Sequence, residues 1–159
     1  MMEFLPLPQR KPHAIARLQG SEHHPKLTGV VRFYQREDGV LVLAQLSGLP
    51  VSGKGCERGV FGFHIHAGSS CSGNDSDPFA DALAHFDTRD CPHPQHAGDL
   101  PPLFATLDGR AFLAVLSDRF FLREVIGRTL IVHASPDDLH TQPSGNAGEK
   151  IACGRIVKA

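Results

Sequence analysis

Two stretches of alternating sequence decide the fold: Val31-Arg32-Phe33-Tyr34-Gln35 and Leu41-Val42-Leu43-Ala44-Gln45-Leu46. In each stretch every second residue is apolar and is expected to face a hydrophobic core, as in a half-buried β-strand. The intervening Glu37-Asp38-Gly39 supplies a glycine where a hairpin turn uses positive φ. Together these residues predict an antiparallel β-hairpin.

Six further segments are short and β-type, and no helical pattern is long enough to anchor an α/β fold. With the hairpin they give eight expected strands, at residues 13–19, 27–35, 40–47, 60–66, 103–107, 111–117, 129–134 and 151–157. Asp108-Gly109-Arg110 marks a second hairpin turn. The sequence therefore predicts an all-β protein with a closed or nearly closed antiparallel barrel.

Two long polar stretches interrupt the strands, at residues 67–102 and 135–149. Long loops inside a compact domain are usually functional. Within the first loop, residues 77–84 predict a short helix, with Asp77 as its N-cap and Pro78 at the first helical position.

The composition fits one soluble globular domain. The chain has 159 residues, 41% of them hydrophobic and 21% charged, with a formal net charge of −1. Nothing in this balance indicates a nucleic-acid or membrane partner, and no apolar run approaches the roughly 20 residues of a membrane span. We expect residues 1–12 to form an N-terminal extension and residues 13–159 to form the domain.

The compartment is predicted from two features that disagree. Residues 1–12 lack an uninterrupted apolar core, which favours a cytoplasmic protein over a secreted one. The four cysteines, Cys56, Cys71, Cys91 and Cys153, form no CxxC pair, and their even number is compatible with disulfides. An exported protein in an oxidising compartment is therefore the alternative.

Histidine is the unusual component, with ten residues in the chain. His64 and His66 are two apart on an expected strand, so both imidazoles project to one side while Ile65 turns into the barrel. Alone, such a pair indicates a metal clamp no more strongly than a surface role. His133, at the end of another strand, offers a third imidazole for a partly open site.

A second group of ligand-type residues lies in the first long loop: His85, His93, His96 and Asp99. Three histidines and one carboxylate can supply a closed tetrahedral zinc site, and a metal would stabilise a loop that has few apolar residues. An imidazole-rich open site favours copper over magnesium, calcium or manganese. The residues thus predict a redox-capable site beside a zinc-like one, without identifying either metal.

Five motifs, in this order, resemble those of copper/zinc superoxide dismutases. They are Gly62-Phe63-His64-Ile65-His66, His85-Phe86-Asp87, His96-Ala97-Gly98-Asp99-Leu100, residues 127–133 with Asp137-Asp138-Leu139, and residues 145–154. The resemblance runs from about residue 13 to residue 157. It implies an eight-stranded Greek-key β-barrel or sandwich with two long functional loops.

The resemblance also assigns ligands. It implies copper bound by His64, His66, His85 and His133, and zinc bound by His85, His93, His96 and Asp99, with His85 bridging the two metals. Asp137 corresponds to a carboxylate that links one copper ligand to one zinc ligand, and Cys71 and Cys153 correspond to the family disulfide. Cys56 and Cys91 have no such counterpart; we expect a second disulfide between them, with two free thiols as the alternative.

The resemblance implies conversion of superoxide to oxygen and hydrogen peroxide by redox cycling of copper, with His85 also carrying a proton. A homodimer is compatible with it, although the sequence carries no signature of a subunit contact. Two other hypotheses stay open: a non-catalytic copper-binding or copper-storage protein of the same fold, and a structural protein with zinc in both positions.

Three features depart from the family pattern. Lys150 stands where the family has an arginine, so a point charge replaces a planar fork that can hold an anion. His93 and His96 are only three residues apart, which requires a tight turn. The loop that precedes Lys150 is also shorter than usual. We expect Lys150 to keep the guiding role with reduced efficiency.

Overall fold

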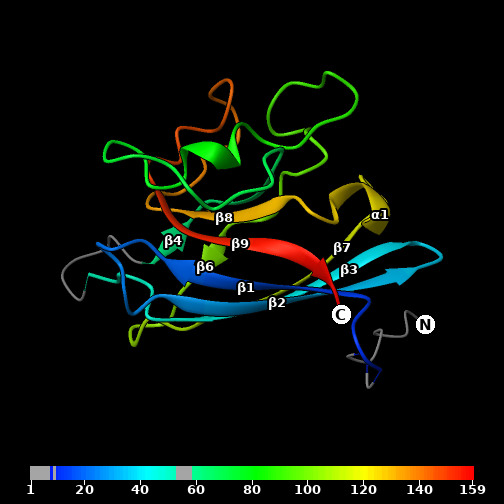
Figure 1. Ribbon diagram of the computed structural model, residues 1–159, viewed down its shortest axis with the longest axis horizontal. Coiled ribbons are helices and arrows are strands. Elements are labelled where there is room, and N and C mark those ends of the chain that lie inside the picture. Colours follow the sequence, from blue (N-terminus) through cyan, green and yellow to red (C-terminus); the bar gives the residue numbers. More distant parts are fainter. Residues whose placement is uncertain (1–7, 9, 53–58) are drawn as a thin grey trace.

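The computed structural model describes residues 8, 10–52 and 59–159 (Figure 1). Its elements in chain order are β1 (Ala14–Gly20), β2 (Thr28–Arg36), β3 (Gly39–Ser47), β4 (Val60–Phe61), β5 (Phe63–His66), a 3₁₀ turn (Ala80–Ala82), β6 (Leu103–Phe104), β7 (Ala111–Ser117), α1 (Leu122–Val125), β8 (Thr129–His133) and β9 (Lys150–Lys158). Most of the expected N-terminal extension, residues 1–12, lies outside the described residues, and the division of the chain into an extension and a domain stays a prediction.

One antiparallel sheet contains seven of the strands, in the order β5-β8-β9-β1-β2-β3-β7. The predicted hairpin is present: β2 pairs with β3 from Thr28–Ser47 to Arg36–Gly39 without a shift in register. Gly39 has a φ of 142° at the turn, a conformation that side-chain-bearing residues rarely adopt.

A short two-stranded sheet, β4 with β6, closes the curled sheet into a barrel. A bridge between Ala105 and Ala111 connects β6 to β7, and β4 continues through Gly62 into β5 at the opposite edge. The predicted strand at 60–66 is thus interrupted at Gly62. A Cβ atom there would approach the Cβ atom of Ala147 to 2.8 Å and that of His133 to 3.3 Å, so glycine allows these segments to pack closely.

The barrel interior is apolar, and the alternation in the hairpin is borne out with one refinement. Val42, Ala44 and Leu46 are buried in the main core, whereas Leu41 and Leu43 form a separate cluster with Tyr34. Since adjacent side chains on a strand point to opposite faces, these three lie on the outer face of the sheet. The prediction of an all-β antiparallel barrel is confirmed.

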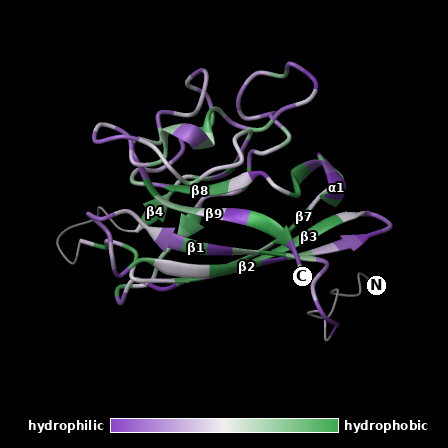
Figure 2. Ribbon diagram, in the orientation of Figure 1, coloured by the Kyte–Doolittle hydropathy of each residue, from purple (hydrophilic) through white to green (hydrophobic). Residues whose placement is uncertain are grey.

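The two long polar loops lie together on one side of the barrel, above β8 and β9 in Figure 1. Figure 2 shows that hydrophilic residues predominate in these loops, while hydrophobic residues follow the strands. The first loop connects β5 to β6 and the second connects β8 to β9, so strands from both parts of the chain lead into the same side of the barrel.

The predicted helix at residues 77–84 is wrong, since only Ala80–Ala82 form a single 3₁₀ turn. The Asp77 carboxylate accepts a hydrogen bond from the Phe79 N–H, as an N-cap would, and also pairs with Lys150, but the helical turn ends at Ala82. The four-residue helix α1, Leu122–Val125, was not predicted because it is too short to show a period. Among the described residues, no helix has the length and apolar content needed to cross a membrane.

Candidate metal centre

Four imidazoles form the first cluster, which we call the copper cluster because the resemblance implies copper there: His64, His66, His85 and His133. Each offers a nitrogen within 4.8 Å of those of the others, and all four residues are buried. Antiparallel pairing of β5 with β8 brings His64 and His66 close to His133. The first loop adds His85, which forms an isolated β-bridge with His66.

The first loop reaches this position because its backbone pairs with the free edge of β5. The Ile65 N–H donates to the Gly98 carbonyl at 2.9 Å, and the Phe86 N–H donates to the Ile65 carbonyl at 2.8 Å. The Ile65 side chain is fully buried in the core, as predicted. The side chains on either side of it therefore face the loop and its ligands.

The outer nitrogen of each strand imidazole is held by an acceptor. His66 Nδ1 donates to the Leu83 carbonyl at 2.7 Å, and His133 Nδ1 donates to the Gly148 carbonyl at 3.1 Å. Their Nε2 atoms, which then carry lone pairs, face each other at 3.2 Å. Two lone pairs at this distance need a cation between them, so this arrangement fits a metal ion.

Unpartnered buried nitrogens support the same assignment. Among the described residues, His64 Nδ1, His85 Nε2, His93 Nδ1 and His96 Nδ1 are buried and have no hydrogen-bond partner. Buried polar atoms are normally satisfied. The first two atoms belong to the four-histidine cluster and the last two to its neighbour, so each cluster has donor atoms free for a metal.

The second cluster contains His85, His93, His96 and Asp99, whose ligand atoms also lie within 4.8 Å of one another. His85 Nδ1 lies 2.8 Å from Asp99 Oδ1, and the Nδ1 atoms of His93 and His96 lie 3.1 and 3.2 Å from Asp99 Oδ2. Three imidazoles and one carboxylate match a four-coordinate zinc site. His85 belongs to both clusters and presents a different nitrogen to each.

Asp137 connects the two clusters by accepting a hydrogen bond from one histidine of each. Its Oδ2 accepts a hydrogen bond from His64 Nε2 at 2.6 Å, and its Oδ1 accepts one from His93 Nε2 at 2.8 Å. Burial favours the protonated carboxyl, but hydrogen bonds from His64, the Leu139 N–H and His93 hold the pKa of Asp137 well below its ordinary value. Ionised Asp137 fixes the orientation of both rings, as such partners do at metal sites.

Gly145 makes room for this connection. It adopts a φ of 70°, and a Cβ atom there would collide with Asp137 Oδ1 and His93 Nε2. Glycine is therefore required both by the backbone conformation and by the space that the hydrogen bond occupies.

Burial lowers the pKa values of three imidazoles of the copper cluster, so these rings are in the neutral form that binds a metal. Burial and the nearby His64 lower the pKa of His133 to about 3. The pKa of His66 is also well below its ordinary value, first because of burial and then because His133 is close. Burial lowers the pKa of His64 too, although its hydrogen bond to Asp137 opposes this. At neutral pH these rings are uncharged, so no proton competes with the metal.

The short spacing between His93 and His96 is accommodated by a turn that other segments support. The Gln142 side chain accepts from the His93 N–H at 2.9 Å and donates to the His93 carbonyl at 2.7 Å. Arg119 donates to the Pro94 carbonyl at 2.7 Å. The second loop thus holds the backbone of a zinc ligand in the first loop.

We expect Gln142→Ala to speed zinc release. Two hydrogen bonds, each with a net contribution of about 1 kcal/mol, are lost, and their sum of about 2 kcal/mol corresponds to about a 30-fold faster dissociation rate. Zinc transfer to a chromogenic chelator measures this rate. Gln95→Ala, in the same turn, is the matched control and should change it little. Equal rates for the two variants would show that the side chain of Gln142 does not support the site.

A disulfide joins Cys71 in the first loop to Cys153 on β9, with a sequence separation of 82 residues. The predicted pair is therefore present. Cys91 forms no disulfide with a described residue. Its expected partner Cys56 lies outside the described residues, so the second disulfide stays a prediction.

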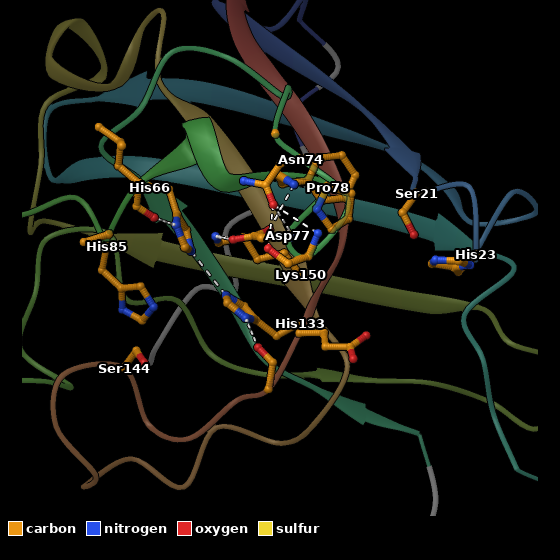
Figure 3. Close-up of a pocket in the computed structure, with 18 of the residues that line it drawn as sticks. Ser21, His23, His66, Asn74, Asp77, Pro78, His85, His133, Ser144 and Lys150 are labelled. Atoms are coloured by element: carbon orange, nitrogen blue, oxygen red, sulfur yellow. Dashed lines mark hydrogen bonds and ion pairs between the residues drawn. The ribbon is translucent and has the colours of Figure 1, made fainter.

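A cavity of about 1160 Å³ opens onto the copper cluster, and its wall includes His66, His85 and His133. Lys150 lines the same cavity (Figure 3). It begins β9 directly opposite His133 in the sheet register. Its Nζ atom lies 2.5 Å from Asp77 Oδ2, a pairing that the sequence did not predict.

Several contacts of the centre were missed because they carry no local signal. The carbonyls of Leu83 and Gly148 act through the backbone, so residue type does not reveal them. Gln142 is an ordinary loop residue in the sequence. Only its contact with His93, which is 49 residues away in the sequence, identifies Gln142 as part of the site.

The fold and the two clusters define a class: an antiparallel β-barrel with a bimetallic centre in which one imidazole serves both metals. Residues 27–156 match the family model of copper/zinc superoxide dismutase. The Cu-Zn superoxide dismutase of Deinococcus radiodurans is 34% identical over 146 residues, which cover 81% of this chain and 76% of that protein. The Cu-Zn superoxide dismutase of Legionella pneumophila is 32% identical, and the match covers 83% of this chain and 79% of that protein. The Cu-Zn superoxide dismutase of Onchocerca volvulus is 31% identical, and the match covers 91% of this chain and 95% of that protein.

The chain therefore belongs to the copper/zinc superoxide dismutase family. It is an enzyme that converts superoxide to oxygen and hydrogen peroxide, with copper at His64, His66, His85 and His133 and zinc at His85, His93, His96 and Asp99. This membership favours the enzyme over the copper-storage and structural hypotheses that the sequence left open.

Proposed function

We propose that superoxide enters through the cavity above the copper cluster and is bound there by the ammonium of Lys150. The observation that carries this proposal is the position of Lys150 in the cavity wall beside His133. A small anion close to a fixed cation gains electrostatic attraction, and this attraction raises its local concentration.

Lys150 and the family arginine differ in the geometry that they offer an anion. A guanidinium presents two parallel N–H groups, whereas an ammonium is a compact charge that fixes no single orientation. Lys150 therefore attracts superoxide but orients it weakly. Copper, when bound, supplies the one-electron oxidation and reduction that the reaction needs.

His85 is the second residue to which we assign a role in the reaction. Its Nε2 atom is buried in the copper cluster and has no hydrogen-bond partner among the described residues, while its Nδ1 atom contacts Asp99. Nε2 can thus take up a proton whenever it is not shared with a metal, and the adjacent cavity gives it a path to a bound anion. His85 would both hold metal and deliver a proton at this atom.

Lys150 variants test the anion role. With copper and zinc loaded, we expect Lys150→Arg to match or exceed the parent in its rate constant for superoxide and Lys150→Glu to lose at least about tenfold. Pulse radiolysis measures these constants directly. Lys158→Glu makes the same charge change at the exposed far end of β9 and should have a much smaller effect. Equal constants for all of these proteins would refute the role.

Assembly and compartment stay predictions. A homodimer is our expectation for the assembly, and sedimentation velocity would test it. The cytoplasmic location expected from residues 1–12 competes with an oxidising compartment, which the Cys71–Cys153 disulfide supports. Fractionation of the source cells would decide between these locations.

A further inference from the structure

We propose that Asp77 restrains Lys150 and so limits how strongly the copper cavity binds an anion. This inference rests on the proposed role of Lys150 and adds a second residue that sets its strength. The Lys150 ammonium lies 2.5 Å from the Asp77 carboxylate, and the two side chains are 16% and 37% exposed. The pair is thus partly shielded from solvent, where an ion pair is screened less than at an open surface.

Asp77 is held in place by its own loop. Its Oδ1 accepts a hydrogen bond from the Phe79 N–H at 3.0 Å, and its N–H donates to the Asn74 side chain at 3.1 Å. Figure 3 shows Asn74, Asp77 and Lys150 together in the cavity wall. Although burial opposes it, the hydrogen bonds from Lys150 and Phe79 lower the pKa of Asp77. An ionised carboxylate in a fixed position therefore faces the ammonium.

The remaining charges of the cavity act in the same direction. Among the described residues that line it, four are carboxylates (Glu22, Asp75, Asp77 and Glu149) and one, Lys150, is a lysine. With histidines counted as neutral, the lining is net negative, and its one lysine is already paired. An anion that binds Lys150 must therefore displace Asp77 from it or bind to an ammonium whose charge is largely compensated.

Asp77 and Lys150 come from different parts of the chain. Asp77 lies in the first loop and Lys150 begins β9, and the Cys71–Cys153 disulfide connects the same two segments. The covalent bond keeps the carboxylate within reach of the ammonium. The first loop thus carries both the cysteine that is bonded to β9 and the carboxylate that pairs with Lys150.

Azide binding to the copper/zinc-loaded protein tests the inference without turnover. In Asp77→Asn the retained Oδ1 can still accept the Phe79 N–H, while the charge that pairs with Lys150 is gone. We expect this variant to bind azide about three- to tenfold more tightly than the parent, as followed by the optical spectrum of Cu(II). Asp75→Asn is the matched control, because it removes the same charge from the same cavity without removing the partner of Lys150.

Superoxide rate constants give a second readout. Because an unpaired ammonium attracts anions more strongly, the constant for Asp77→Asn should fall more steeply with ionic strength than that for Asp75→Asn. Bound metal charges are the same in both variants, so the comparison isolates the side chains. If the two variants gave the same azide affinity and the same salt dependence, the restraint by Asp77 would be refuted.

A double variant separates this failure from failure of the Lys150 role. Lys150→Met in the Asp77→Asn background should weaken azide binding and flatten the salt dependence if Lys150 binds the anion. If it weakens binding but Asp77→Asn behaves like Asp75→Asn, Lys150 keeps its role and only the restraint is refuted. If Lys150→Met changes nothing in either background, the proposed role of Lys150 fails, and the inference fails with it.

Discussion

His85→Ala is expected to lower the dismutase activity of the metal-treated protein by more than about 100-fold. Partners that only orient metal ligands already contribute 10–100-fold to affinity or activity, and His85 is itself a ligand of both clusters. Its loss leaves three ligands at each metal and removes the nitrogen to which we assign proton delivery. Metal content by mass spectrometry and the superoxide rate constant measure the two consequences separately.

The control for this variant is His23→Ala. His23 lines the same cavity but belongs to neither cluster, so this change should preserve metal content and most of the activity. The expected pattern for His85→Ala is reduced zinc retention and lost activity while the barrel stays folded by circular dichroism. Full retention of both metals together with parental activity would contradict the bridging assignment.

Cys71→Ala/Cys153→Ala is expected to lower the free energy of unfolding of the metal-free protein by about 4.5 kcal/mol, if the bond acts by limiting the entropy of the unfolded chain. The bond closes a segment of 82 residues, which includes most of the first loop. Cys153 is buried against Phe79 and Ile131, so the substitution also removes packed sulfur. Urea denaturation of both proteins under oxidising conditions measures the difference.

Cys91→Ala and a reducing agent provide the controls. Cys91→Ala leaves the Cys71–Cys153 bond intact, so this variant should not show the loss that we assign to that bond. Reductant should destabilise the parent toward the value of the double variant, and any further loss in the double variant would report the predicted Cys56–Cys91 disulfide. A parent that is equally stable with and without reductant would show that the bond contributes little to stability.

Most of the strand framework was predictable because its signal is local. The segment at 111–117 was expected with the bounds that the structure gives, and the hairpin of β2 and β3 pairs as its glycine turn indicates. Turn residues and alternation are properties of neighbouring positions. The interruption at Gly62 was not predictable, since it depends on the approach of Ala147 and His133 from distant segments.

The helix expected at residues 77–84 shows where local rules fail. Asp77 and Pro78 are good residues for a helix start, yet the chain forms one 3₁₀ turn. The disulfide at Cys71 and the ion pair with Lys150 connect this segment to β9. Tertiary contacts of this kind override a weak helical propensity.

The sequence by itself determined the strands, the residue types of both metal clusters and, through ordered motifs, the family. These depend on short patterns: alternate residues share a strand face, and the residue type alone shows whether a side chain can bind a metal. Only the tertiary structure decided which nitrogen of each imidazole is free, that Gln142 holds His93, and that Asp77 pairs with Lys150. The physical reason is that hydrogen bonds and ion pairs depend on distances of a few ångströms between segments that are far apart in the sequence, by 49 residues for Gln142 and His93 and by 73 for Asp77 and Lys150.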